Sequence, residues 1–533
     1  MSSKRKAEHK ILSFSTTMRT PQRIAGFLIR LKKYDGQVLT NELIDKIVKD
    51  VIRKKLYWTM YLKSKPDLKS VYESEDIYFT DEQLEEIVAN SPQKHKESGF
   101  DKGWPSRFQT WYGLCKEFGF ADYGIGKTVN ISQSGHMLCD AYEPTDTEED
   151  VSKTIQNVFL NALVKYPSNN PFRRNANENI PLLLLMNVIK LLKEDENNAG
   201  VSRKEIPFIL CWPDNDATKL YKYIKDFRAK YGFTASDDTV YKMCLNLLNS
   251  TNETRFKKSQ ITKEAVDDFL RKMRVTGVIA LRGMGRFVDF NKLESQKIEY
   301  VLKNYGEYRT FATELEYYNF IGKMDAQIVS IETDAVTYNI QDIRKAKLSE
   351  VASKYSNEQI RYELELLSTN RGSKDLYFSD IDEPTRLEFL TSIALQQALA
   401  GASVEPNYHI DDEGNPTFTA SGGLGDIEVY DSSHNSLFEV TLMRGKNQAV
   451  LEIPAIKRHL DEIKEEKNKF AVFVAPFLHA DATFMIDFTK YHHKLDIFGY
   501  TITEFCEKLK TTTLLQQFDK SITKPLTDPD KLC

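Results

Sequence analysis

The chain of 533 residues is long enough for several domains, and its 41% hydrophobic and 28% charged residues are typical of globular proteins, which excludes a disordered or fibrous chain. Its longest apolar run, residues 182–192, is interrupted by Asn187 and Lys190, and no signal peptide opens the chain. We therefore expect a cytoplasmic protein that does not bind or cross a membrane. The six cysteines form no C-x-x-C pair, which indicates reduced thiols.

Positive charge is concentrated near the amino terminus, although the whole chain has a net charge of -4. Residues 1–60 contain 14 Lys or Arg against 5 Asp or Glu. Such an excess indicates a phosphate-binding surface, for which Arg19, Arg23, Lys32 and Lys33 are the candidate DNA contacts. The alternative is a solvated surface whose charge is balanced by acids from elsewhere in the chain.

The first half of the chain predicts helices followed by short hairpins. Helices are expected over residues 41–57, from Asp81, and over residues 108–118, where Gly119 ends the helix. Two strands, residues 120–123 and 127–131, then flank a tight turn.

The same order recurs later in the chain. A helix over residues 266–273 is followed by strands over 278–281 and 286–290. A helix with a two-stranded ribbon is the closing half of a winged helix-turn-helix, and helices over 180–192 and from Ser202 supply an opening for the second copy. We therefore expect a DNA-recognition domain over residues 1–290, with winged-helix subdomains at about 15–145 and 180–290. Its wings place Lys127, Arg282 and Arg286 near phosphate, and a module that binds only protein is the alternative.

The second half of the chain changes character after a connector over residues 291–340. Helices alternate with strands over residues 341–533, which predicts an α/β domain. Its expected elements are helices over 358–367, 383–399 and 449–466 and strands over 426–430, 437–442, 470–474 and 495–501.

Three acids of this domain lie where a solvated helix face does not explain them. Asp426 follows a glycine-rich stretch at the start of a strand, and Glu439 lies in the middle of an apolar strand, where a carboxylate is costly without compensation. Glu452 lies in the first turn of the next helix, with His459 two turns along the same side. Oxygen ligands from two strands and a helix end suit Mg²⁺. Alone, Glu452 reads as a helix-dipole acid and His459 as a core residue.

The order Gly-Asp-Ile-Glu, Phe-Glu-Val-Thr-Leu and a helical Glu resembles the nuclease core of the AlwI family of type IIS restriction endonucleases. The opening block at residues 15–23 and 34–40 is also similar to that family. The resemblance implies a restriction-endonuclease-like PD-(D/E)xK domain whose catalytic acids are Asp426, Glu439 and Glu452, with Mg²⁺ held by these three. It adds a glutamate from the preceding helix, Glu388 or less favourably Glu383, and the histidine His459.

The chain departs from the wider nuclease pattern at one position, because Thr441 stands where Glu-x-Lys has its lysine. The function of that lysine is then left to Glu452, His459, Arg444 or Lys446.

These observations predict an α+β multidomain enzyme, in which a mostly helical tandem winged-helix domain precedes an α/β nuclease domain over residues 341–533. We expect a type IIS restriction endonuclease that binds a short asymmetric double-stranded DNA sequence and cuts a few base pairs outside it with Mg²⁺. Cutting both strands calls for a transient homodimer or a second subunit. The alternatives are a nicking enzyme of the same family and a DNA-binding protein whose nuclease-like domain is inert.

Overall fold

The computed structural model describes residues 8–14, 18–143, 151–196, 200–332, 339–463 and 468–518. The described residues form two compact units: unit 1 contains those up to Tyr72 and from Tyr78 to Glu332, and unit 2 contains Glu73–Ile77 and those from Asn339 onward. Cys533, the start of the opening block and the end of the helix expected over 449–466 lie outside the described residues. The five described cysteines are buried and free. In the described ranges, no helix is both long enough and apolar enough to cross a membrane.

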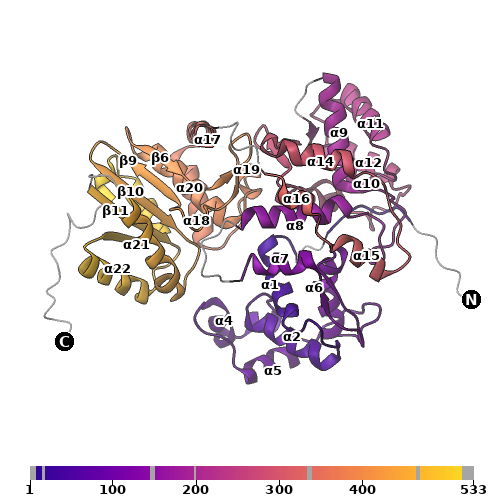
Figure 1. Cartoon of the computed structure of the whole chain (residues 1–533), viewed down its shortest axis with the longest axis horizontal. Coiled ribbons are helices and arrows are strands. Elements are labelled where there is room, and N and C mark those ends of the chain that lie inside the picture. The colour runs from indigo at the N-terminus through magenta and orange to yellow at the C-terminus, as the bar shows by residue number, and fades with distance from the viewer. Residues whose placement is uncertain are drawn as a thin grey trace, which may run out of the picture. The chain divides into compact units, whose positions relative to one another are not determined.

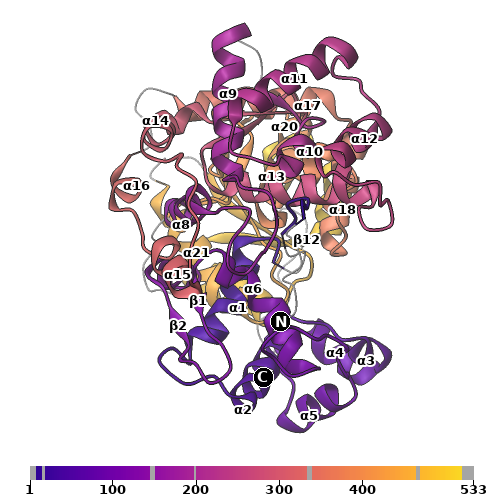
Figure 2. The ribbon, with the colours of Figure 1, turned by 90° about the vertical axis from the view of Figure 1, so that its right-hand side faces the viewer.

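Unit 1 is mostly helical. Its main elements are α1 (Pro21–Lys32), α2 (Asn41–Arg53), α3 (Met60–Ser64), α4 (Pro66–Glu73), α5 (Asp81–Ala89), α6 (Trp104–Glu117), β1 (Ala121–Asp122), β2 (Asn130–Ile131), α7 (Gln133–Asp140), α8 (Ser152–Lys165), α9 (Pro181–Glu196), β3 (Val201–Ser202), α10 (Ile206–Cys211), α11 (Ala217–Tyr231), α12 (Asp237–Leu247), the π-turn η1 (Gln260–Glu264), α13 (Ala265–Val275), β4 (Ile279–Arg282), β5 (Phe287–Phe290), the short 3-10 turn η2 (Lys292–Glu294), α14 (Ser295–Asn304), α15 (Glu314–Ile321) and α16 (Ala326–Ser330). Within this unit, Figure 2 shows α2–α5 grouped at one end and α9–α12 at the other.

Helix α8 is the central element of unit 1. Its residues from Asn157 to Lys165 are all buried, including the polar Asn157, Asn161 and Lys165. A helix that is buried on every side must be covered by neighbouring elements on every side. Accordingly α8 contacts α7, α9, α13, α15 and α16, and α8 runs between the groups containing α7 and α14 in Figure 1.

Both expected helix-and-hairpin units form in unit 1. Helices α6 and α13 end at Gly119 and Gly277, whose φ angles of 69° and 78° are in the left-handed region that favours glycine. The second hairpin, β4–β5, is regular, and β3 adds a third strand through Ser202, which pairs with Phe287. Because Ser202 is held in that strand, the helix expected there begins at Ile206 instead.

Acids from later in unit 1 neutralise part of the amino-terminal positive charge. Lys32 binds Asp140 and Glu143, each at 2.6 Å. Lys33 binds Asp50 at 2.7 Å. Lys49 binds Glu85 at 2.5 Å, and Arg53 pairs with Asp81. These pairings agree with the alternative interpretation, in which acids from elsewhere in the chain balance the charge, and the most distant of them, Glu143, lies 111 residues from Lys32.

Unit 2 is a mixed sheet between two helical layers. Its elements are α17 (Ile340–Lys354), α18 (Asn357–Ser368), α19 (Leu376–Ser379), α20 (Glu383–Ala398), β6 (Ser403–Pro406), β7 (His409–Ile410), β8 (Pro416–Phe418), β9 (Ile427–Tyr430), β10 (His434–Val440), the π-turn η3 (Gln448–Glu452), α21 (Ile453–Glu462), β11 (Asn468–Ala475), α22 (Ala480–His493), β12 (Asp496–Thr501), α23 (Ile502–Leu509) and the 3-10 turn η4 (Leu515–Phe518).

The strand order of the five-stranded sheet is β12-β11-β10-β9-β6. Strands β10, β11 and β12 are parallel, whereas β9 runs antiparallel to β10 and to β6. Helices α21 and α22 pack on one face with Leu437 and Phe473, and Phe438 on the other face contacts Phe505 of α23. In Figure 1, α21 and α22 lie below the orange and yellow strands and α20 lies beside them. The sheet is therefore covered on both faces.

The helix expected over residues 449–466 is two elements in the structure, the π-turn η3 and the helix α21. Pro454 lies in the first turn of α21. Proline has no backbone N–H and crowds the preceding turn, so a regular α-helix does not continue through it. Glu452 therefore ends a π-turn directly before α21 rather than lying in the first turn of one long helix.

Candidate active site

Two of the predicted acids meet where β9 and β10 pair. Asp426 directly precedes β9, and Glu439 is the next-to-last residue of β10. The register Phe438↔Ile427 brings them side by side. The carboxylate of Asp426 accepts a 2.8 Å hydrogen bond from the backbone N–H of Val440, and its carboxyl group also bonds that of Glu439.

Gly425 makes this close approach sterically feasible. A Cβ atom at this position would lie 2.1 Å from Cδ1 of Leu437 and 3.2 Å from Oε1 of Glu439. A larger residue would require the side chain of Leu437 to move and would press on the carboxyl group of Glu439. Gly425 is thus required for packing. From the sequence it could be described only as part of a glycine-rich stretch.

Glu388 approaches the same pair from helix α20. Its side chain is buried, and its Oε2 accepts a 2.9 Å hydrogen bond from the backbone N–H of Ala420. Glu383, the weaker candidate, lies in the first turn of α20 with 51% of its side chain exposed, near Arg386. Of the two, Glu388 is therefore the acid that the structure brings near Asp426 and Glu439.

Glu452 and His459 complete the group from the other side of β10. Oε1 of Glu452 accepts a 3.2 Å hydrogen bond from the hydroxyl of Thr441, the residue in the position of the missing lysine. Nδ1 of His459 lies 2.9 Å from Oε1 of Glu439. Glu439 and His459 are buried, whereas Asp426 and Glu452 remain partly exposed. The structure therefore gathers all five predicted catalytic residues in unit 2.

The four carboxyl groups disfavour each other's ionisation. Burial, with repulsion from Asp426 and Glu439, raises the pKa of Glu388 well above its ordinary value. Burial and repulsion from Glu439 and Glu452 do the same for the pKa of Asp426. Burial and the charge of Glu452 raise the pKa of Glu439 to about 8. Burial also raises the pKa of Glu452, and the Thr441 hydrogen bond opposes that shift. Such a cluster requires protons or a cation to balance its charge.

The donor chemistry of the cluster fits a hard divalent cation, because its ligating atoms are carboxylate oxygens whose mutual repulsion a cation relieves. The carboxyl groups of Asp426 and Glu439 are, however, hydrogen-bonded to each other. Across the described ranges, no group of three or more His, Cys, Asp or Glu side chains is arranged to hold a metal ion. The acids are therefore of the residue types that bind a metal ion, but among the described residues no three of them are positioned to bind one together.

A polar pocket of about 320 Å³ adjoins the acids. Gly425 and His459 belong to its wall, so the pocket reaches the residues that contact Asp426 and Glu439. Its other lining residues come from the loop before β9, from β9 and β10, and from the end of α21 and the residue after it, and they are Gly423, Leu424, Glu428, Tyr430, Asn435, Leu437, Glu462 and Ile463.

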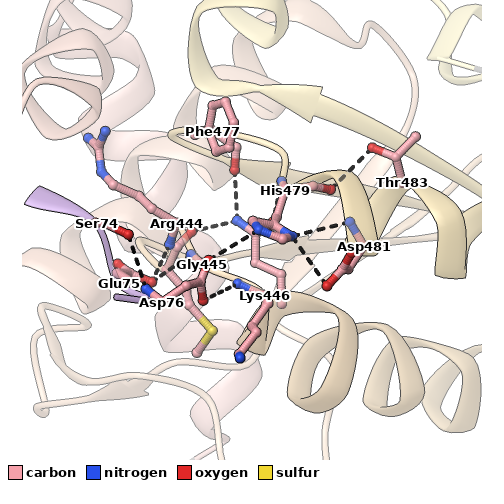
Figure 3. Close-up of polar contacts among 12 residues, drawn as sticks. Ser74, Glu75, Asp76, Arg444, Gly445, Lys446, Phe477, His479, Asp481 and Thr483 are labelled. Carbon is pink, nitrogen blue, oxygen red and sulfur yellow. Dashed lines mark hydrogen bonds and ion pairs between the residues drawn. The ribbon is translucent and has the colours of Figure 1, made fainter. Parts of the chain in front are cut away.

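The two basic residues that follow β10, Arg444 and Lys446, contact other parts of the chain. The guanidinium of Arg444 donates to the carbonyl of Ser368, and Lys446 is exposed. The backbone of both residues instead binds the segment around Glu75, as Figure 3 shows. Among the described residues, Thr441 is the one of these three neighbours whose side chain bonds to the acids.

The predicted DNA contacts in unit 1 differ in accessibility. Arg19 and Arg286 are exposed, and 63% of the Lys127 side chain is exposed. The guanidinium of Arg23 donates to the carbonyl of Leu56, and burial lowers its pKa. Arg282 is buried and donates to the carbonyl of Phe290. Lys32 and Lys33 form the ion pairs described above. Arg19, Lys127 and Arg286 are therefore the side chains most available to a ligand.

Several site features carried no sequence signal. Gln448 is fully buried, and its amide donates to the carbonyls of Met443 and Phe477 at 2.6 and 2.7 Å while accepting from the N–H of His479. It thereby fixes the loop between Glu439 and Glu452. The hydrogen bond from Thr441 to Glu452 could not be predicted from the sequence either, because the π-turn η3 determines where Glu452 lies.

A group of carboxylates beside a polar pocket is compatible with metal-assisted hydrolysis. The chain matches the family model of the AlwI restriction endonuclease over residues 113–373 and 316–507, more than half of its length. It therefore belongs to the AlwI restriction endonuclease family and is a site-specific deoxyribonuclease that acts on DNA. This match confirms the resemblance and the class of enzyme predicted from the sequence.

Solved structures similar to this chain are also restriction endonucleases. The small subunit of the heterodimeric restriction endonuclease R.BspD6I is 23% identical, with 29% of this chain and 76% of that chain covered and a TM-score of 0.25. Restriction endonuclease FokI is 11% identical, with 92% and 97% covered and a TM-score of 0.23. FokI bound to DNA is 10% identical, with 98% of both chains covered and a TM-score of 0.22. No curated protein matches this chain.

Proposed function

We propose that the protein is a type IIS restriction endonuclease, which binds a short asymmetric sequence of double-stranded DNA and hydrolyses phosphodiester bonds a few base pairs outside it. The observation that carries this proposal is the convergence of Glu388, Asp426, Glu439 and Glu452, whose pKa values are all raised. Perturbed acids that gather beside a pocket are typical of a catalytic site.

Asp426 and Glu439 would hold Mg²⁺, and Glu452 would complete its coordination or act as the base. The bound ion would polarise the phosphate and lower the pKa of the attacking water. Glu388 tunes the charge of the group or contributes to a second ion. His459 contacts Glu439 and orients its carboxylate, so that it acts as a positioning residue.

Hydrolysis also requires a group that accepts the proton of the attacking water. Glu452 is suited to this step because it is partly exposed and its raised pKa makes it a better base than an ordinary carboxylate. The hydroxyl of Thr441 holds one oxygen of Glu452 and leaves the other for the water. With Glu452 as the base and Thr441 holding it in position, the reaction does not need a lysine at position 441.

Unit 1 is the candidate recognition domain. Its two helix-and-hairpin segments, α6 with β1–β2 and α13 with β4–β5, are the proposed winged helices. A wing places basic residues along phosphate, and Lys127 and Arg286 lie in the two turns. A recognition unit joined to a separate nuclease unit is the geometry that a displaced cut requires.

Nicking is the second candidate function. The described residues contain one such group of acids, which hydrolyses one strand at a time. Cutting both strands therefore calls for a second copy of this chain or for a separate subunit. An enzyme that does not assemble in this way nicks its site.

The test is incubation of purified protein with supercoiled plasmid and Mg²⁺, beside an Asp426→Asn variant. Asp487→Asn is the matched control, since this acid is exposed on α22. We expect discrete fragments from the wild type and from the control, and a loss of cleavage of at least 100-fold from Asp426→Asn. Sequencing the ends then gives the site and the offset.

Each remaining outcome points to a different function. Open circles alone show a nicking enzyme. If Asp426→Asn cleaves at the wild-type rate, the assignment of the acids is wrong. If sequence-specific binding is observed without cleavage under any divalent cation, the protein is a DNA-binding protein with an inert nuclease-like unit.

A further inference from the structure

The loop of residues 444–446, between β10 and η3, directs three consecutive backbone N–H groups at carboxylates from a distant part of the chain. The N–H groups of Arg444 and Gly445 both donate to Oε2 of Glu75 at 2.7 Å. That of Lys446 donates to Oδ1 of Asp76 at 2.7 Å. Nε2 of His479 lies 3.1 Å from Oδ2 of Asp76. Figure 3 shows these contacts, and Glu73–Ile77 belongs to unit 2 with the loop.

Gly445 lets the anions come close to the backbone. A Cβ atom there would lie 2.6 Å from Oδ1 of Asp76 and 2.7 Å from Cβ of Glu75. Successive N–H groups that converge on one side of a loop form a concave anion-binding surface, and a side chain at Gly445 would fill it. The 444–446 loop therefore has the shape and the donors of an anion site.

The donors are held by contacts that do not involve the two acids. The amide of Gln448 fixes Met443 and the chain near Phe477, and it accepts the N–H of His479. Glu75 is exposed and Asp76 is partly exposed, so the hydrogen bonds of Glu75 and the ion pair of Asp76 with His479 are accessible to water and can exchange. The N–H donors of the loop are thus held in place by the rest of unit 2, whereas Glu75 and Asp76, which now bind them, are accessible to solvent.

The position of the loop identifies its ligand. It lies between Glu439 and Glu452 in the chain and follows the strand that carries Glu439. Its three N–H groups and an imidazole are suited to the two non-bridging oxygens of a phosphodiester, which resembles a single carboxylate in its one negative charge and its two accepting oxygens. A duplex whose scissile bond meets the acids has neighbouring phosphates close by.

We propose that the 444–446 loop and His479 bind a backbone phosphate of double-stranded DNA, and that Glu75 and Asp76 occupy this site in the free protein and compete with DNA for it. This inference rests on the proposed nuclease function. DNA binding then requires displacement of the 73–77 segment, and the apparent affinity is lowered by the fraction of molecules in which the segment is bound.

The test measures binding of a fluorescein-labelled duplex of random sequence by the full-length protein in EDTA, by fluorescence anisotropy at several salt concentrations. The variant is Glu75→Gln/Asp76→Asn. The control Asp67→Asn/Glu253→Gln removes the same charge at two exposed positions of unit 1. The third protein adds Gly445→Ala to the first variant and fills the site.

We expect Glu75→Gln/Asp76→Asn to bind about 3- to 10-fold more tightly than the control, because the competitor is removed. The slope of log K against log salt should steepen by about 0.9, the value for one added phosphate contact. Addition of Gly445→Ala should reverse both changes. The single variant Asp76→Asn should give part of the gain in affinity. It tests the proposal even if the double variant is too unstable to be measured.

Equal affinities and equal slopes for Glu75→Gln/Asp76→Asn and the control would overturn the proposal, as would a gain that Gly445→Ala leaves intact. Plasmid cleavage by the wild type is scored separately. Cleavage without the affinity gain refutes the phosphate site alone. The affinity gain without cleavage under any divalent cation supports the phosphate site and refutes the nuclease function.

Discussion

Replacement of Glu439 by Gln should stabilise the metal-free protein and abolish cleavage. Glu439 is buried in β10 beside Asp426, and burial and the charge of Glu452 raise its pKa from 4.5 to about 8. Glutamine has the same shape, carries no charge and keeps an oxygen that accepts a hydrogen bond from His459. The substitution therefore removes the cost of ionisation without creating a cavity.

The size of the effect follows from the two pKa values. Between pH 4.5 and 8 the folded protein retains a proton on Glu439 that the unfolded chain has released, so stability falls as the pH rises through this window. The loss attributable to Glu439 is about 1 kcal/mol at pH 5 and about 4 kcal/mol at pH 8. Below pH 4.5 both states are protonated and the loss disappears.

The assay is thermal unfolding in EDTA at pH 5 and pH 8, with Glu365→Gln on the exposed side of α18 as the control. At pH 8 the transition of unit 2 should rise by about 10 °C in Glu439→Gln, and at pH 5 by only about 3 °C. Equal gains at the two pH values would show that packing, rather than ionisation, is responsible. No gain at pH 8 would show that the charge of Glu439 is already compensated in the folded protein, which would refute the reasoning.

The remaining predictions concern the metal, the base and the recognition unit. Mg²⁺ or Ca²⁺ should raise the melting temperature of the wild type at pH 8 but not that of Asp426→Asn, because ligand binding stabilises only the state that holds the ion; equal shifts would place the ion elsewhere. In the wild type the hydrogen bond from Thr441 lowers the pKa of Glu452. Thr441→Val removes this bond, so the pKa of Glu452 should rise and the acidic limb of the pH profile of the cleavage rate should move to higher pH. An unchanged limb would exclude Glu452 as the titrating base. Lys127→Ala and Arg286→Ala should each reduce the salt slope of DNA binding by about 1, and slopes equal to that of the wild type would remove these residues from the interface.

Local patterns were sufficient for much of unit 2. Successive residues of a strand face opposite sides of the sheet, and in β10 Phe438 contacts Phe505 on one face whereas Glu439 contacts His459 on the other. Asp426 and Glu439 meet because β9, which Asp426 directly precedes, pairs with β10, which contains Glu439. Glu452 reaches them from the end of the π-turn η3 and not from the first turn of a long helix. Glu388 was identified only by resemblance, since its helix precedes β9 by many residues and no local pattern links the two.

Long-range pairing explains what sequence patterns missed. The bonds from Glu75 to Arg444 and Gly445 span 369 and 370 residues. The acids that bind Lys32 are likewise remote in the chain. Strand β6, which closes the sheet beside β9, is short and contains Pro406, so it resembled a loop. Such contacts depend on the assembled fold and leave no periodic trace.

The threonine at position 441 bears on how the acids are balanced. A lysine there would lie beside Glu452 and would lower the pKa of the neighbouring carboxyl groups through its own charge. Thr441 supplies one neutral hydrogen bond instead, and the pKa of Glu452 stays raised. Arg444 and Lys446 turn their backbone N–H groups toward Glu75 and Asp76, and the guanidinium of Arg444 is bonded to Ser368. With threonine at position 441, the charge of the four acids must be balanced by protons, by His459 beside Glu439 or by a cation from solution. At pH 8, where fewer protons are bound, a cation should therefore stabilise unit 2 more than it would if position 441 held a lysine.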